Sequence, residues 1–213
     1  MDHAAQRTEL VEMTRRVSAT GLSIGTSGNL SVRVEGGVLI TPSGRDVDNL
    51  EPADICLVDV DGRQVAGELR PSSEVPMHLA VYRSSDAKAV VHTHSPYATA
   101  LSITLNELPA VHYTINGLGG PVRVAPYATF GTPELAANIA TALTDRNAAI
   151  LQNHGTIATG ASLRQAFERV ELLEWLATLH WRALQVGSPK MLTQDELTDV
   201  REQSARLRYE SRR

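Results

Sequence analysis

Two histidines lie two positions apart at the end of an apolar run, in A-V-V-H-T-H-S-P at residues 89–96. Because side chains alternate between the two faces of a strand, His92 and His94 are expected to point the same way, about 6.6 Å apart along the chain. Two imidazoles in this relation can bind one metal ion, with bonds of about 2.0–2.1 Å each. The chemistry that this pair predicts is metal binding.

A third histidine, His154, follows another apolar run in L-Q-N-H-G at residues 151–155. If the strands that end at His94 and Gln152 are neighbours, the three imidazoles converge. Three neutral nitrogens with an open coordination position are typical of a catalytic divalent ion; Zn²⁺ is favoured, and Mn²⁺ and Co²⁺ stay open. On spacing alone, the alternative is three ordinary hydrogen-bonded histidines, and that interpretation is preferred for His78 and His112.

Three short segments have the composition of oxyanion-binding loops: T-S-G-N at 26–29, T-P-S-G at 41–44 and P-S-S-E at 71–74. Backbone N–H groups and hydroxyls in such loops bind phosphate, although each segment taken singly is also an ordinary turn or cap. Glu74, after the paired serines, can interact with a helix N-terminus or, beside a metal, transfer protons or act as a fourth ligand. No phosphate-binding G-x-x-x-x-G-K-[ST] or G-x-G-x-x-G is present, which disfavours a nucleotide-binding fold.

The elements that would position these residues alternate between strands and helices. Hydrophobic periodicity and turn residues predict helices at 5–19, 74–83, from 96 onward, 132–143 and 162–186, and strands at 29–34, 38–41, 54–60, 63–66, 89–94, 122–125 and 148–152. The hairpins come first and the helices mostly cover later strands. We therefore expect an α/β fold, a three-layer α/β/α sandwich with a mixed, largely antiparallel central sheet, in a single domain over residues 1–213.

Composition excludes several classes of function. The formal net charge is −4 and the pI about 6.0, so no basic nucleic-acid-binding surface is expected. No window approaches the roughly 18–20 apolar residues of a membrane span, and the N-terminal residues lack the charge and apolar pattern of a signal peptide. The one cysteine, Cys56, lies in an apolar run and is expected to be buried. The expected location is the cytoplasm.

Taken together, the motifs resemble those of a known family. The ordered segments G-N-L-S, T-P-S-G, P-S-S-E-x-x-x-H, V-V-H-T-H-S, A-P-Y-A-T-F-G-T and L-Q-N-H-G resemble the class II aldolase/adducin family over about residues 8–186, and most of all its aldolases for L-fuculose 1-phosphate. The resemblance implies a zinc enzyme with an α/β/α fold. It also implies a four-fold symmetric homotetramer whose active sites lie at subunit interfaces.

The resemblance also implies roles for individual residues. His92, His94 and His154 would bind the metal, and Glu74 would be the acid/base and a possible fourth ligand in the absence of substrate. Tyr113 and Tyr209 would be catalytic tyrosines, Tyr113 acting from a neighbouring subunit and Tyr209 from a C-terminal tail at about 200–213. The implied phosphate-binding residues are Gly28, Asn29, Ser43, Gly44, Ser72 and Ser73.

The implied function is retro-aldol cleavage of a ketose 1-phosphate, such as L-fuculose 1-phosphate, to dihydroxyacetone phosphate and an aldehyde such as L-lactaldehyde. Lys88 and Lys190 are the only lysines and neither lies in a motif, which argues against a Schiff-base aldolase. Alternatives are an L-ribulose-5-phosphate 4-epimerase, a methylthioribulose-1-phosphate dehydratase and a non-catalytic adducin-like interaction module. Within the family that the motifs resemble, Glu74 and Tyr113 favour the aldolase over the epimerase. The presence of all three histidines disfavours the non-catalytic interaction module.

Overall fold

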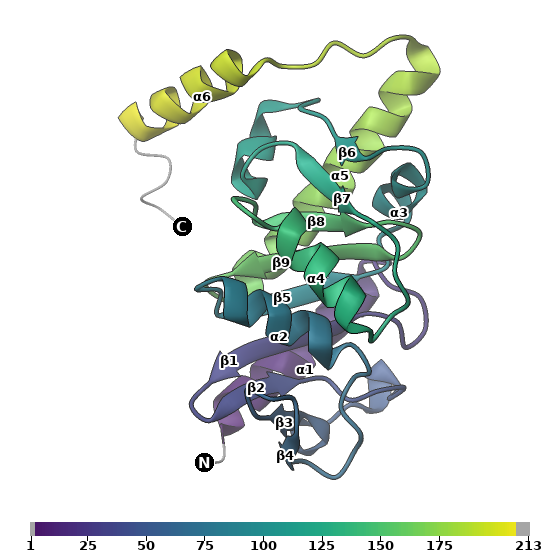
Figure 1. The fold of residues 1–213 in the computed structure, drawn as a ribbon, viewed down its shortest axis with the longest axis vertical. Helices are drawn as coiled ribbons and strands as arrows, with labels where there is room; N and C mark the ends of the chain where they lie inside the picture. The colour runs from purple at the N-terminus through teal and green to yellow at the C-terminus, as the bar shows by residue number, and fades with distance from the viewer. Residues whose placement is uncertain (1–2, 208–213) are drawn as a thin grey trace.

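The computed structural model describes residues 3–207, which contain a nine-stranded sheet with helices on both faces (Figure 1). The strand order is β4-β3-β2-β1-β5-β9-β8-β7-β6. All neighbouring strands are antiparallel except β7 and β8. The strands are β1 (Asn29–Val34), β2 (Gly37–Ile40), β3 (Cys56–Val58), β4 (Gln64–Ala66), β5 (Ala89–Thr93), β6 (Glu107–Leu108), β7 (Val122–Ala125), β8 (Ala148–Leu151) and β9 (Gly155–Gly160).

Helices cover the two faces of the sheet in separate layers. One layer holds α1 (Ala4–Ala19), α3 (Pro96–Ser102) and α5 (Leu163–Val186), and the other holds α2 (Val75–Ser84) and α4 (Pro133–Ala142). The alternation of β5 shows why both layers form: Ala89 and Val91 pack in the first apolar cluster, and Val90 packs in the second. The predicted three-layer α/β/α sandwich is confirmed. Among residues 3–207, no helix is long and apolar enough to cross a membrane.

The short strand β6 and the strand β9 were not predicted, and β9 determines which strands are neighbours at the centre of the sheet. It lies between β5 and β8 and pairs antiparallel with both. The strands that end near His94 and Gln152, β5 and β8, are therefore not direct neighbours, so the condition considered for convergence of the histidines is not met. The sequence of β9 is G-T-I-A-T-G, which carries a single large apolar side chain, so its apolar pattern is too weak to mark a strand.

The helix α6 (Gln194–Arg206) was also not predicted. Thr193 and Glu196 form a capping box at its start, but Leu197 is its only buried residue, so an apolar stripe is nearly absent. It packs beside the 3₁₀ helix η3 (Tyr113–Leu118), where the Asn116 side-chain amide donates to the Leu197 carbonyl at 2.9 Å. Figure 1 shows α6 reaching beyond the sheet at the end of the molecule away from α1.

The C-terminal tail that was predicted to contribute to the active site, at about 200–213, lies only partly within the residues that the structure describes. Residues 200–206 belong to α6, and Tyr209 lies outside the residues that the structure describes. A role for the tail and for Tyr209 stays a prediction. A single domain over residues 1–213 likewise stays a prediction.

Candidate metal centre and active site

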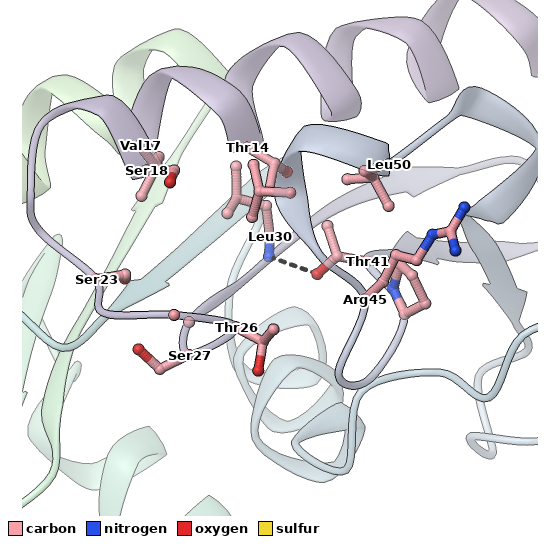
Figure 2. Close-up of a pocket in the computed structure, with 14 residues that line it drawn as sticks. Thr14, Val17, Ser18, Ser23, Thr26, Ser27, Leu30, Thr41, Arg45 and Leu50 are labelled. Atoms are coloured by element: carbon pink, nitrogen blue, oxygen red, sulfur yellow. Dashed lines mark hydrogen bonds between the residues drawn. The ribbon is translucent and has the colours of Figure 1, made fainter.

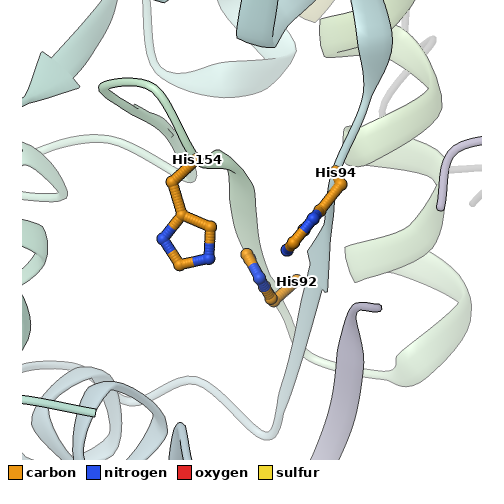
Figure 3. A group of neighbouring side chains, drawn as sticks. All are labelled: His92, His94 and His154. Carbon is orange, nitrogen blue, oxygen red and sulfur yellow. The ribbon is translucent and has the colours of Figure 1, made fainter. Parts of the chain in front are cut away.

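The three predicted metal-binding histidines lie together on the face of the sheet that α2 and α4 cover. His92 is on β5, His94 follows the end of β5, and His154 lies in the turn between β8 and β9 (Figure 3). Their ring centroids are 4.9–5.0 Å apart in all three pairs, and one nitrogen from each ring lies within 4.8 Å of the others. The predicted convergence of these side chains is therefore present, although by a different route from the one expected.

The route is the antiparallel pairing of β9 with β5. Thr93 pairs with Thr156, so the start of β9 lies beside the end of β5. Asn153 has a φ of 55°, which reverses the chain just before His154. Gly155 allows the close approach, because a Cβ there would lie 2.2 Å from the Thr93 carbonyl oxygen and 3.2 Å from the His94 ring.

The ring of fully buried His92 is fixed by the backbone behind it. Its Nδ1 lies 2.8 Å from the Thr156 carbonyl oxygen, which can only accept, so Nδ1 carries a proton. Its Nε2 faces Glu74 Oε2 at 3.2 Å, and His154 Nε2 faces Glu74 Oε1 at 3.3 Å. Among the described residues, His92 Nε2 and Glu74 Oε1 are buried without a hydrogen-bond partner.

These unpartnered lone pairs test whether the residues fit a metal ion. Buried polar atoms are normally hydrogen-bonded, and an exception needs a physical reason. A cation bound by three imidazoles, with the carboxylate as an additional ligand, provides that reason, and this donor set is one that zinc favours. The residues therefore fit a divalent metal ion.

The protonation states also suit metal binding. Burial, together with the neighbouring His92 and His154, lowers the pKa of His94 to about 4, so this ring is neutral near pH 7. Burial alone would raise the pKa of Glu74, but the facing His92 and His154 and the hydrogen bond from Asn29 lower it well below its usual value. A neutral imidazole and an ionised carboxylate are the forms that bind metals.

Glu74 is aimed at the histidines rather than at its own helix. It is the N-cap residue of α2, yet its side chain makes no capping hydrogen bond. Its backbone N–H donates to Ser72 Oγ at 3.2 Å, and its Oε2 accepts from the Asn29 side chain at 2.8 Å. Glu74 as a whole residue is 7% exposed, so its side chain is held inside the site.

The three predicted oxyanion loops lie side by side next to this site. Thr41, in the second loop, links that loop to the other two. Its hydroxyl accepts from the N–H of Leu30, which follows the first loop, at 3.2 Å, and its carbonyl accepts from the N–H of Ser72, in the third loop, at 3.2 Å. Gly28 adjoins the end of β5: its φ is 83°, and a Cβ would lie 2.9 Å from the His92 carbonyl oxygen. Ser43, Gly44 and Ser73 are exposed, whereas Asn29 and Ser72 are buried.

A separate pocket lies behind these loops, between them and α1 (Figure 2). Thr14, Ser23, Thr26 and Arg45 are among its lining residues. Of the six predicted phosphate-binding residues it includes only Gly28. We therefore do not assign this pocket to the phosphate.

Tyr113 is not among the side chains that the structure gathers around the histidines of the same chain. It begins η3, is 51% exposed, and stacks on His112 with ring centroids 4.4 Å apart. His112 in turn contacts Trp175 edge to face at 5.0 Å. An exposed position is the one required of a residue that acts in the site of a neighbouring subunit.

Sequence reasoning assigned no catalytic role to Ser31, His78 and Tyr82, which extend the site inward from Asn29. All three are buried, and hydrogen bonds link them to one another. The available signals were the i, i+4 spacing in E-x-x-x-H-x-x-x-Y and the i, i+2 spacing in N-x-S, each of which places its members on one face of a helix or strand.

Comparisons with known proteins agree with this fold and site. The family described as Class II Aldolase and Adducin N-terminal domain matches residues 8–181. The 5-deoxy-D-ribulose 1-phosphate aldolase of Bacillus thuringiensis serovar kurstaki is 41% identical over 92% of this chain and 93% of that protein. The L-fuculose phosphate aldolase of Escherichia coli strain K12 is 44% identical over 87% of this chain and 85% of that protein. A solved structure described as L-fuculose 1-phosphate aldolase has a TM-score of 0.89 at 41% identity, and the match covers 92% of this chain and 94% of that one.

The sandwich fold and its histidine-lined site place the protein in the class II aldolase fold class. The chain belongs to the class II aldolase and adducin family, and the resemblance identified from its motifs is confirmed.

Proposed function

We propose that this chain is a zinc-dependent aldolase that cleaves a ketose 1-phosphate to dihydroxyacetone phosphate and an aldehyde. The observation that carries the proposal is the presence of unpartnered buried atoms on His92 and Glu74, with His94 and His154 beside them. Such a cluster favours a divalent cation next to a carboxylate able to transfer protons, which is what a retro-aldol reaction needs.

The reaction needs an electron sink, because breaking a carbon–carbon bond beside a carbonyl leaves an electron pair on carbon. Zinc held by His92, His94 and His154 would supply Lewis-acid stabilisation of that charge. Glu74, ionised in the free site, would take up a proton from solvent when the substrate binds and give it to the carbon that stays with the ketone, which then becomes dihydroxyacetone phosphate. The hydroxyl proton of the departing carbon would pass to Tyr113 of a neighbouring subunit, acting as a phenolate, and from there to solvent, and the hydroxyl oxygen becomes the aldehyde carbonyl.

The oxyanion loops would anchor the phosphate. Their backbone N–H groups and hydroxyls supply hydrogen bonds at the unreactive end of the substrate, and this binding orients the reacting end. The residues that we propose for this role are Gly28, Asn29, Ser43, Gly44, Ser72 and Ser73. Their support is the contact of the three loops with one another and with the end of β5.

A homotetramer with active sites at its interfaces is part of the proposal. Large apolar side chains are exposed on α5, on η3 and in the segment between β7 and α4, as is expected of surfaces that subunits cover. They include Tyr113, Tyr127, Phe130, Trp175, Trp181 and Leu184, each at least 40% exposed.

Two substrates of one reaction type are supported by the relatives. L-fuculose 1-phosphate would give L-lactaldehyde, and a 5-deoxypentulose 1-phosphate would give acetaldehyde; both release dihydroxyacetone phosphate. The names of the similar proteins support each of them at 41–44% identity. The 4-epimerase and the dehydratase remain the alternatives, and the presence of all three histidines with Glu74 is evidence against a non-catalytic module.

The test is a panel of 1-phosphorylated ketoses, scored by coupled detection of dihydroxyacetone phosphate. We expect release with at least one ketose, loss of release with a chelator, and recovery when zinc is restored. Formation of a dehydrated ketone phosphate would instead assign the dehydratase reaction, and conversion of L-ribulose 5-phosphate to its 4-epimer would assign the epimerase. Absence of all these products in the zinc-loaded protein would overturn the proposal.

A further inference from the structure

A single line of five buried polar side chains runs from the metal-site carboxylate into the layer between β1 and α2. Glu74 Oε2 lies 2.8 Å from Asn29 Nδ2, and Asn29 Oδ1 lies 2.6 Å from His78 Nε2. His78 Nδ1 lies 2.6 Å from Ser31 Oγ, which lies 2.8 Å from the Tyr82 hydroxyl. Glu74, His78 and Tyr82 recur every four residues at the start and along α2, so one helical face meets one face of β1.

The direction of each hydrogen bond in this line follows from its ends. The amide nitrogen of Asn29 donates to Glu74 Oε2, and its carbonyl oxygen therefore faces His78. That oxygen only accepts, so His78 carries a proton on Nε2. Burial lowers the pKa of His78 to about 3, although Glu74 acts in the opposite direction, and the ring is therefore neutral with a bare Nδ1. Ser31 must then donate to His78, and Tyr82 must donate to Ser31.

The same chain of donors excludes the reversed arrangement. If His78 carried its proton on Nδ1, Nε2 would accept, and the Asn29 amide would have to rotate to donate to it. The carbonyl oxygen of Asn29 would then face the carboxylate of Glu74, placing two acceptors in contact. His78 and Ser31 are fully buried, so water is not at hand to relieve that contact.

We propose that His78 is a positioning residue for the reaction: its Nε2–H locks the Asn29 amide so that the amide nitrogen holds Glu74 toward the three histidines, and Ser31 and Tyr82 fix the tautomer of His78. This inference rests on the proposed function for its effect on turnover. The hydrogen-bond arrangement itself stands independently of the reaction.

The arrangement is tested by nitrogen NMR of isotope-labelled histidine in the zinc-loaded protein. We expect His78 to show a protonated Nε2 and a bare Nδ1. Replacing Ser31 by Ala removes the donor to Nδ1, and we expect a measurable population of the other tautomer to appear. A native ring protonated on Nδ1, or on both nitrogens, would overturn the proposal. This measurement needs no turnover, so it decides the proposal even if the chain cleaves no ketose phosphate.

The effect on turnover is tested with two replacements of similar size, His78→Leu and His78→Gln. Leucine removes the donor to Asn29, so we expect kcat to fall about ten-fold or more while KM and zinc content change less than about two-fold. Glutamine can donate from its amide nitrogen and accept from Ser31, so it should recover most of that loss. Native kcat in His78→Leu, or an equal loss in both variants, would contradict a positioning role.

Controls separate positioning from a general loss of structure. Thr159→Val removes another buried hydroxyl, on β9 at the end away from His154, and should leave kcat unchanged. If His78→Leu does not fold, Ser31→Ala is the second variant. We expect it to lower kcat with KM unchanged, and an unaltered kcat in Ser31→Ala would count against the proposal.

Discussion

The two carboxylate oxygens of Glu74 have different surroundings. A substitution can therefore keep the hydrogen bond that positions the side chain and still remove its ability to transfer a proton. Oε2 accepts from Asn29, whereas Oε1 faces His154 at 3.3 Å without a hydrogen-bond donor. In Glu74→Gln the amide oxygen can still accept from Asn29, but proton transfer is lost. We expect zinc to stay bound while turnover falls about 100-fold or more.

Zinc stoichiometry and the rate of dihydroxyacetone phosphate release would check this expectation together. Glu134→Gln is a matched control, since Glu134 is an exposed carboxylate in the first turn of α4. Undiminished cleavage by Glu74→Gln would reject the proton-transfer role, and loss of zinc would show that the carboxylate is needed for metal retention.

A second prediction for a single residue concerns His94, one of the three proposed metal ligands. Changing groups that only support a metal ligand typically costs 10–100-fold in metal affinity, so removing a ligand should cost at least about 100-fold. We therefore expect His94→Ala to lose zinc during dialysis against a weak chelator, as measured by metal analysis. His180→Gln, at a buried histidine on α5, should retain it. Full zinc retention in His94→Ala would remove His94 from the ligand set.

At the scale of elements, the long periodic segments could be predicted and the short, small-residue ones could not. The helices α1 and α5 carry apolar residues at helical spacing, and β5 begins with a continuous apolar run, so the sequence indicates them directly. The strand β9 has small residues and glycines because it must fit closely between two others. Motif spacing therefore located His154 correctly, while the strand that brings it to His94 stayed hidden.

The prediction for the secondary-structure elements concerns Gly155, where β9 approaches β5 closely. A Cβ at this position would meet the Thr93 carbonyl oxygen at 2.2 Å, so Gly155→Ala must push the start of β9 away from β5. We expect a loss of about 1–3 kcal/mol in the free energy of unfolding and weaker zinc binding, measured by urea denaturation and metal titration. Gly187→Ala is the control, because a Cβ there meets nothing within 4 Å. Equal stability of the two variants would mean that β9 does not need this close approach.

For the whole molecule, buried neutral histidines link stability to pH. The pKa of His78 is lowered by burial to about 3, and that of His94 to about 4, against the usual 6.5. As the pH falls below about 6.5, the unfolded chain takes up protons that the folded chain does not, so the free energy of unfolding decreases.

Urea denaturation in chelator, at fixed protein concentration, would measure this dependence between about pH 5 and pH 7. We expect His78 to contribute a slope approaching about 1.4 kcal/mol per pH unit below its usual pKa, and His78→Gln to remove that contribution. His94 acts in the same direction, so part of the slope should remain in the variant. An unchanged slope in His78→Gln would show that His78 is protonated in the folded protein.

The proposed homotetramer gives a second prediction that belongs to the whole molecule. Tyr113 stacks on His112 at the surface, so the catalytic role that we propose for it would require a second copy of the chain. We expect Glu74→Gln and Tyr113→Phe to be nearly inactive alone. In randomly mixed tetramers, a site that takes Glu74 from one subunit and Tyr113 from its neighbour is intact in about a quarter of cases. Denaturing and refolding the two variants together should therefore restore about a quarter of native activity, whereas refolding each alone should restore none. If mixed tetramers form but stay inactive, both residues act within one subunit, whereas native activity of Tyr113→Phe alone would show that Tyr113 takes no part.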